Sequence, residues 1–149
     1  MKRLIWILIL LGGLYFAYTH RGSLPLGDVD LVSASNSAHA DQVLGDAFRE
    51  QRSNFQIEGE GVVTRILPDD TKGSRHQRFI LRLSSNQTLL IAHNIDLAPR
   101  VSGIGVGDRV QFNGEYEWNS QGGVIHWTHH DPGGQHPAGW LRHGGSTYQ

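Results

Sequence analysis

The sequence predicts a small all-β domain, a closed barrel of five strands that follows a hydrophobic helix and a short amphipathic helix. Three observations predict this class. Apolar and polar residues alternate in five short runs between residues 55 and 130. Turn residues separate these runs, and glycines stand inside the first of them, where a sheet can bend. Cysteine is absent, so a packed apolar core has to hold the domain together.

The N-terminal segment, residues 1–21, has the layout of a signal anchor or a signal peptide. Lys2 and Arg3 precede an uncharged apolar run that ends near Thr19. Good cleavage residues do not follow the run directly, which favours an uncleaved anchor in the inner membrane. The positive-inside rule then places the rest of the chain in the periplasm. A cleaved signal would instead release the domain into the periplasm as a secreted protein.

Residues 22–37 are small and polar, and they predict a linker. Residues 38–54 then carry apolar side chains at helical spacing, at Val43, Leu44 and Phe48. We expect a short amphipathic helix here that packs on the barrel. The domain itself, with its histidine- and glycine-rich tail, is expected to occupy residues 55–149.

Five runs with the period of a β-strand come next. On the second run Gln77, Phe79 and Leu81 share one face, and on the fourth run Val110, Phe112 and Tyr116 do so. These faces should form the core. The expected strands are "FQIEGEGVVTRIL" (55–67), "RHQRFILRLS" (75–84), "TLLIAHNI" (88–95), "DRVQFNGEYEWN" (108–119) and "VIHWTH" (124–129).

The strand count and the connections favour an OB-like barrel. Five strands fall within about 75 residues, and a long connection, residues 96–107, separates the third strand from the fourth. That connection is too short and too rich in glycine for much helix. An SH3-like barrel is the alternative architecture.

Several blocks of the sequence resemble a known family. They are "LPDDTKGSRHQRFILRL", "TLLIAHNIDLAPRV", "GDRVQFNGEYEWN" and "GGVIHWTHHDPGGQHPAGWLRHGGSTYQ", which together cover most of residues 55–149. The chain is similar to an uncharacterised bacterial family, a domain of unknown function in short exported proteins with a C-terminal motif of the HWTHHDPGGQHPAGW type. The resemblance implies an OB-like barrel behind an export segment, and it implies no activity.

Histidines gather at the C-terminal end, where five of the nine lie between residues 126 and 143. Imidazole and carboxylate ligands without thiolate would suit zinc or another divalent metal. Their spacing matches no standard metal motif, and backbone hydrogen bonding within a tail that wraps the barrel is the alternative. The candidate metal ligands are His126, His129, His130, Asp131 and His136.

A second group of polar residues stands at the ends of the second and third strands. His76 and Arg78 begin one strand, while His93 and Asp96 close the next. A carboxylate can orient an imidazole and raise its basicity, so these four are candidate ligand-binding residues or an acid–base unit. The alternative is a polar rim with Asp96 in a turn.

Charge and motifs limit the possible functions. From Phe55 onward there are eight Lys or Arg and nine Asp or Glu, a net charge of −1, which argues against a general nucleic-acid binder. The motifs of common nucleophilic enzymes are absent. We expect a membrane-anchored binding module for a small ligand, a metal or a protein partner. The alternatives are a histidine-ligated metal-dependent hydrolase, such as a phosphodiesterase or nuclease, and a single-stranded nucleic-acid binder.

Overall fold

The computed structural model describes residues 28–149, with side chains from residue 36 onward. By internal contacts the chain divides into Met1–Val32 and Ser33–Gln149, and the described strands all belong to the second unit. The predicted signal segment and most of the predicted linker lie outside the described residues. Within the described part, none of the helices has the length and apolar character needed to cross a membrane.

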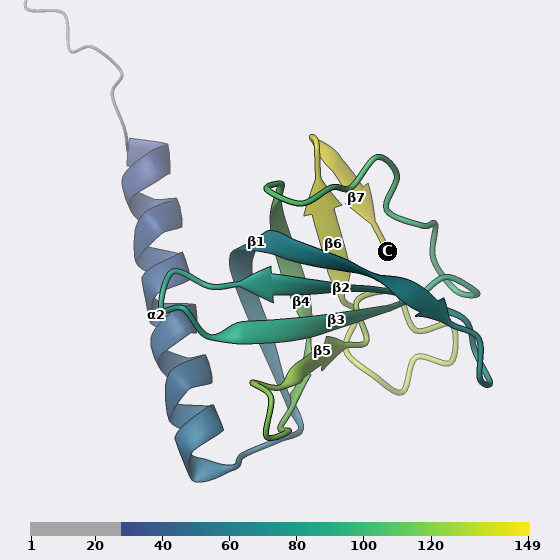
Figure 1. The fold of residues 1–149 in the computed structure, drawn as a ribbon, viewed down its shortest axis with the longest axis horizontal. Coiled ribbons are helices and arrows are strands. Elements are labelled where there is room, and N and C mark those ends of the chain that lie inside the picture. Colours follow the sequence, from purple (N-terminus) through teal and green to yellow (C-terminus); the bar gives the residue numbers. More distant parts are fainter. Residues whose placement is uncertain (1–27) are drawn as a thin grey trace, which may run out of the picture. The chain divides into compact units, whose positions relative to one another are not determined.

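Five strands close on themselves to form a ring (Figure 1). Their order around the ring is β1-β2-β3-β5-β4, and β4 pairs with β1 to close it; only the β3–β5 pairing is parallel. The all-β prediction and the count of five ring strands are thereby confirmed. The ring strands are β1 (Phe55–Asp70), β2 (His76–Arg82), β3 (Thr88–Asn94), β4 (Arg109–Glu117) and β5 (Val124–His126).

Strand β1 closes the ring because it bends and pairs with a different neighbour on each half. Its first half pairs with β4 from Phe55 onward, and its second half pairs with β2. The partner changes at Val62, next to Gly61. Gly59 lies in the half that pairs with β4, and an added Cβ there would stand 2.7 Å from Cζ of Phe112. The absence of a side chain at Gly59 therefore allows the close approach of β1 to Phe112.

The core fills the inside of the ring with alternate residues from each strand. The faces predicted on the second and fourth strands are the buried ones, with Phe79, Leu81, Phe112 and Tyr116 all 0% exposed. Besides apolar residues, the interior holds the imidazole of His93. Strand alternation therefore accounts for the inward faces of β2, β3 and β4.

Helix α2 (Asp28–Glu50) packs along the ring through its C-terminal half. Leu44 and Ala47 are fully buried against the core, and Trp118 donates from Nε1 to the carbonyl oxygen of Phe48. The carboxylate of Asp41, also buried, accepts hydrogen bonds from the turn between β2 and β3. The predicted amphipathic helix is present, and it begins at Asp28, inside the predicted linker.

Other boundaries differ from the predictions for local reasons. Strand β1 continues to Asp70, through residues that were expected to form a loop. Strand β5 ends at His126 because Trp127 adopts a φ of 52°, in the left-handed region that interrupts a strand. The tail adds a hairpin that the sequence did not predict, β6 (Trp140–His143) and β7 (Ser146–Tyr148), and β6 pairs with β4.

Candidate functional site

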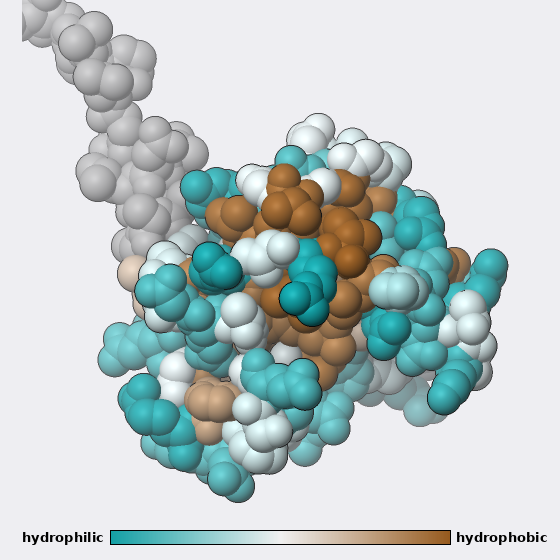
Figure 2. Space-filling model, in the orientation of Figure 1, coloured by the Kyte–Doolittle hydropathy of each residue, from teal (hydrophilic) through white to brown (hydrophobic). Residues whose placement is uncertain are grey.

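A groove of about 550 Å³ lies on the outer face of β1, β2 and β3. We call it the three-arginine groove. Figure 2 shows apolar side chains gathered over these strands, with hydrophilic residues around them. Its lining residues are Thr64, Arg65 and Leu67 from β1, Arg78, Ile80 and Arg82 from β2, Thr88, Leu89 and Leu90 from β3, and Asn119, Gln121 and Gly123 from the β4–β5 turn.

Strand register places the arginines around an aliphatic centre. Arg78, Ile80 and Arg82 alternate with buried residues along β2, so all three project outward. A register shift in β1 after Val63 sets Arg65 opposite Ile80, and Leu90 faces Ile80 from β3. The groove therefore combines three positive charges with a floor of Ile80 and Leu90.

The groove arginines differ from the other arginines of the protein. The side chains of Arg65 and Arg82 have no hydrogen-bond or ion-pair partner among the described residues, and Arg78 donates from Nε to the carbonyl oxygen of Pro68 at 3.0 Å. Arg142 stacks over the Trp140 ring. All remaining described arginines form ion pairs with carboxylates: Arg49, Arg52, Arg75, Arg100 and Arg109.

None of the described carboxylates lines the three-arginine groove, so its three arginine charges meet without a carboxylate among the lining residues. Outside the lining, Asp70 at the end of β1 interacts electrostatically with Arg78. Its pKa is lowered, chiefly by a hydrogen bond from the amide of Lys72 and to a smaller extent by the charge of Arg78. In a chain of net charge −1, such a local patch attracts an anion.

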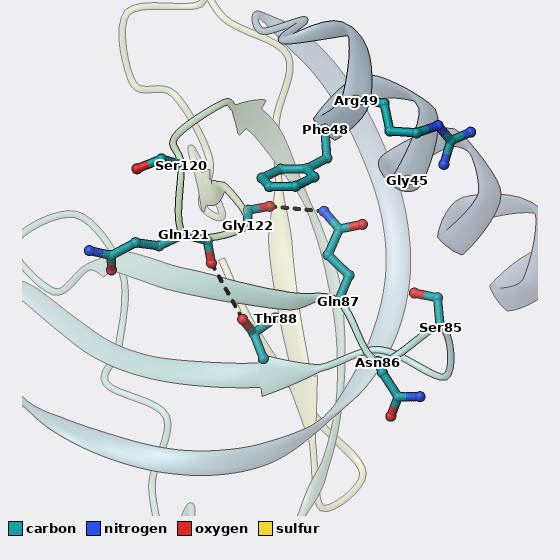
Figure 3. Close-up of a pocket in the computed structure, with 10 residues that line it drawn as sticks. All are labelled: Gly45, Phe48, Arg49, Ser85, Asn86, Gln87, Thr88, Ser120, Gln121 and Gly122. Atoms are coloured by element: carbon teal, nitrogen blue, oxygen red, sulfur yellow. Dashed lines mark hydrogen bonds between the residues drawn. The ribbon is translucent and has the colours of Figure 1, made fainter.

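A second pocket, of about 530 Å³, adjoins the groove and shares Thr88 and Gln121 with it (Figure 3). The ring of Phe48 from α2 lies beside Gln87, whose Nε2 donates to the carbonyl oxygen of Gly122 at 2.8 Å. This bond ties the start of β3 to the β4–β5 turn. It thereby positions the turn that forms one end of the groove.

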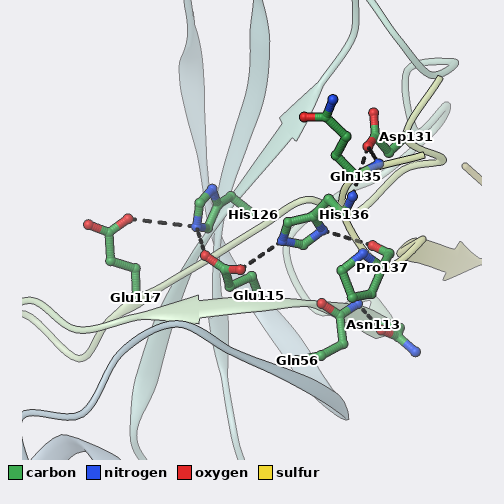
Figure 4. A network of polar contacts seen from close by, with 9 residues as sticks. All are labelled: Gln56, Asn113, Glu115, Glu117, His126, Asp131, Gln135, His136 and Pro137. Atoms are coloured by element: carbon green, nitrogen blue, oxygen red, sulfur yellow. Dashed lines mark hydrogen bonds and ion pairs between the residues drawn. The ribbon is translucent and has the colours of Figure 1, made fainter. Parts of the chain in front are cut away.

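A separate polar network joins β4, β5 and the loop of residues 127–139 (Figure 4). Nε2 of His136 lies 2.7 Å from Oε2 of Glu115, and its Nδ1 lies 2.9 Å from the carbonyl oxygen of Pro137. The ring also stacks on Trp127, with centroids 4.1 Å apart. Both ring nitrogens therefore face acceptors, an arrangement that suits the protonated imidazolium.

The pKa of His136 reflects this environment. Burial acts to lower it, but the hydrogen bonds to Glu115 and to the Pro137 carbonyl, with the charges of Glu115 and Asp131, outweigh burial and raise the pKa. The charged imidazolium of His136 therefore contributes fully to the stability of the folded protein below the unfolded-state pKa of 6.5. It is lost as the pH rises through the higher folded-state pKa.

Replacing Glu115 by glutamine is expected to bring the pKa of His136 back toward its ordinary value, because the charged acceptor at Nε2 is removed. The measurement is a titration of the imidazole proton resonances by NMR. Glu117→Gln is the matched control, since Glu117 faces His126 and not His136. An unchanged His136 pKa in Glu115→Gln would contradict the described contact.

The five candidate metal ligands do not come together as one group. His126 and His136 both approach Glu115, with Nε2 of His126 3.5 Å from its Oε1. His129 is buried and its Nδ1 contacts the carbonyl oxygen of His130, which is itself exposed. Asp131 accepts three backbone N–H groups, which lower its pKa. Among residues 28–149, groups of three His, Asp or Glu side chains suited to a metal ion are absent.

The four candidate ligand-binding residues contact different partners and do not line one pocket. His93 is enclosed in the core, Asp96 pairs with Arg75, and Nδ1 of His76 contacts the carbonyl oxygen of Ser74. The structure does not join His93 and Asp96 as an acid–base unit, because inward alternation on β3 buries His93 and Asp96 pairs with Arg75. Of the four, Arg78 alone lines the three-arginine groove.

His93 has a structural role instead. Its Nε2 donates to the carbonyl oxygen of Pro99 at 3.1 Å, and its Nδ1 accepts from the hydroxyl of Thr128 at 2.8 Å. These bonds fix the neutral tautomer with the proton on Nε2. Burial lowers the pKa of His93 from 6.5 to about 4.

The sequence prediction missed Arg65 and Arg82 in the groove, and Glu115 in the histidine network. A signal for Arg82 was present, because it alternates with Arg78 on the polar face of a predicted strand. Arg65 could not be placed in this way, since its position depends on the register shift in β1.

One protein family matches most of the chain. A family model with the description "Protein of unknown function (DUF3465)" matches residues 29–149. Curated proteins give no match to the chain. The matched residues include the whole strand ring and the C-terminal hairpin, and they bear out the expected resemblance to a family of unknown function.

Proposed function

The chain belongs to the DUF3465 family of proteins of unknown function, and we propose that it is a binding module that takes an anionic ligand in the three-arginine groove. One observation carries this proposal: three outward arginines without a carboxylate partner line a single groove, whereas five arginines elsewhere are paired. Guanidinium groups recognise phosphate and carboxylate through paired N–H donors. The groove volume of about 550 Å³ falls in the usual range for small-ligand sites.

We further propose that the ring is an OB-like barrel. OB-folds bind ligands on the face of their second and third strands, beside the loop between the fourth and fifth strands. The three-arginine groove occupies the corresponding place on β2 and β3, beside the β4–β5 turn. This correspondence is an analogy at the level of the fold, and it supports the location of the site and not the identity of the ligand.

For its cellular setting, we propose that residues 1–21 anchor the chain in the inner membrane and that the domain faces the periplasm. The support is the sequence, in which Lys2 and Arg3 precede an apolar run. A cleaved signal, with release into the periplasm, is the second form of this proposal. In both forms the groove meets ligands outside the cytoplasm.

The test uses the full chain in nanodiscs of phosphatidylcholine, with inorganic pyrophosphate as the probe. Binding is measured by calorimetry, and the same titration into empty nanodiscs is subtracted. We expect Arg65→Gln and Arg82→Gln each to weaken binding about tenfold, because each removes a charged donor worth roughly 1.5 kcal/mol. Arg75→Gln is the matched control, because Arg75 is paired with Asp96 outside the groove.

Two results would count against the proposal. If pyrophosphate does not bind, or if Arg65→Gln and Arg82→Gln weaken binding no more than Arg75→Gln does, the groove is not the anion site. Salt provides an independent readout. Affinity through uncompensated arginines should fall as sodium chloride is raised, and it should fall less steeply in the arginine variants.

A further inference from the structure

We propose that the natural ligand is an anionic amphiphile, a molecule with an alkyl or acyl chain and a phosphate or carboxylate head. Its head would bind the groove arginines, and its chain would lie on the aliphatic floor. The inference rests on the proposed function, because it assigns a ligand class to the same groove.

The floor of the groove is apolar on the outward side of the sheet, where polar residues are normal. Leu67, Ile80 and Leu90 line the groove there, and each of them is partly exposed. Figure 2 shows apolar surface over the region of β1 and β2, with hydrophilic side chains set among it. An exposed apolar patch with a polar rim is typical of a binding surface.

Strand β4 of the same ring provides an internal comparison. Its outward residues are all polar or charged, at Arg109, Gln111, Asn113, Glu115 and Glu117. The outward faces of one ring thus differ in character, aliphatic with arginines over β1–β3 and polar with carboxylates over β4. Solvent exposure alone does not explain this difference, whereas a bound alkyl chain on the first face does.

Register shows how a chain could leave the head group. Arg78 and Arg82 flank Ile80 along β2, while Ile80 pairs with Leu90 and Leu90 pairs with Val124 of β5. This row crosses two strand spacings, about 10 Å. An anion held by the arginines over Ile80 can therefore direct its chain across Leu90 toward Val124.

The side chains that line the groove favour this class of ligand over single-stranded nucleic acid. Single-stranded nucleic acids are bound by stacking on aromatic side chains. The described residues that line the three-arginine groove include no aromatic side chain and no carboxylate. The groove therefore offers charge and aliphatic contact, without a platform for a base.

The experiment measures affinity along a series of alkyl phosphates, from methyl to octyl, below their micelle concentrations. It uses the full chain in phosphatidylcholine nanodiscs, with the signal from empty nanodiscs subtracted. Burial of each methylene on the floor should raise affinity about fourfold, until the row is covered. Ile80→Thr and Leu90→Thr should flatten this dependence, so that octyl phosphate gains little over methyl phosphate in either variant. Val106→Thr is the control, because Val106 is 68% exposed outside the groove.

The possible results separate the inference from the proposed function. Arginine-dependent binding of every phosphate with no gain along the series would overturn the amphiphile and leave the anion site intact. If the unchanged protein binds neither methyl phosphate nor pyrophosphate, both the inference and the proposed function are overturned. A chain-length gain that persists in both threonine variants would also overturn the inference, because the chain would then lie elsewhere.

A final comparison identifies the source of the amphiphile. The series is repeated with phosphatidylglycerol in place of part of the nanodisc phosphatidylcholine. If phosphatidylglycerol competes for the groove, the affinity for octyl phosphate should fall in the unchanged protein. Such a fall, absent in Arg65→Gln, would support a membrane lipid as the ligand. Unchanged affinity would support a free amphiphile of the same chemistry.

Discussion

Replacing His93 by leucine is expected to destabilise the folded protein by about 3 kcal/mol at pH 7.5. His93 is 0% exposed, and the change leaves the hydroxyl of Thr128 and the carbonyl oxygen of Pro99 without their partner. An unsatisfied buried polar group costs about 1–3 kcal/mol, and added apolar burial offsets only part of two such losses. Urea denaturation of both proteins measures the difference.

The double variant His93→Leu/Thr128→Val provides the control for this first prediction. It also removes the hydroxyl of Thr128, which the single change leaves without an acceptor, so it should recover about 1 kcal/mol of stability. A single variant as stable as the unchanged protein would contradict the described role of His93. A double variant that recovers no stability relative to His93→Leu would instead show that the Thr128 hydroxyl has another buried partner.

The same histidine should make the protein sensitive to acid between pH 6.5 and about 4. In this interval the unfolded chain binds a proton at residue 93 and the folded chain does not, so stability falls as the pH falls. A pKa change from 6.5 to about 4 corresponds to a loss of about 3 kcal/mol. His93→Leu should lack this part of the pH dependence.

Replacing Gly139 by alanine is expected to cost about 3 kcal/mol or more and to displace the loop of residues 127–139 from β4. An added Cβ would stand 2.5 Å from the carbonyl oxygen of Asn113 and closer still to that of Trp127. Both obstacles are backbone atoms, so no side-chain rotation relieves the overlap. Thermal unfolding measures the stability, and the NMR-measured pKa of His136 reports whether its contact with Glu115 survives.

Gly105→Ala is the control for this second prediction. Its added Cβ would meet its closest neighbour, Oδ2 of Asp108, at 3.8 Å, an ordinary contact. A small effect there with a large effect at Gly139 would tie the loss to the close approach of the loop. Equal effects at both positions would contradict that explanation.

Much of the fold can be predicted from periodicity along the chain. Alternation predicted the buried faces of β2 and β4, including Phe79 and Phe112, and glycines marked the bend of β1. The C-terminal hairpin was not predictable in this way. Its strands are too short to show a period, and β6 is held by pairing with β4, which is distant in sequence.

The candidate site was less predictable than the fold. Arg78 was identified from its position on the second strand, but its companions Arg65 and Arg82 were not. The histidines of the tail drew attention because they are close in sequence. In the structure His136 instead meets Glu115, and His93 is enclosed in the core.

The sequence by itself determined the all-β class, the inward face of the second and fourth strands and the family resemblance, because a two-residue period and block motifs are local properties of a chain. Tertiary structure alone decided which charges remain unpaired. Arg75 and Arg65 are alike as sequence, yet β2–β3 pairing brings Asp96 to the first, and a shift of register leaves the second beside Ile80. Partnership between distant residues depends on register and strand order, and these arise only when the ring closes.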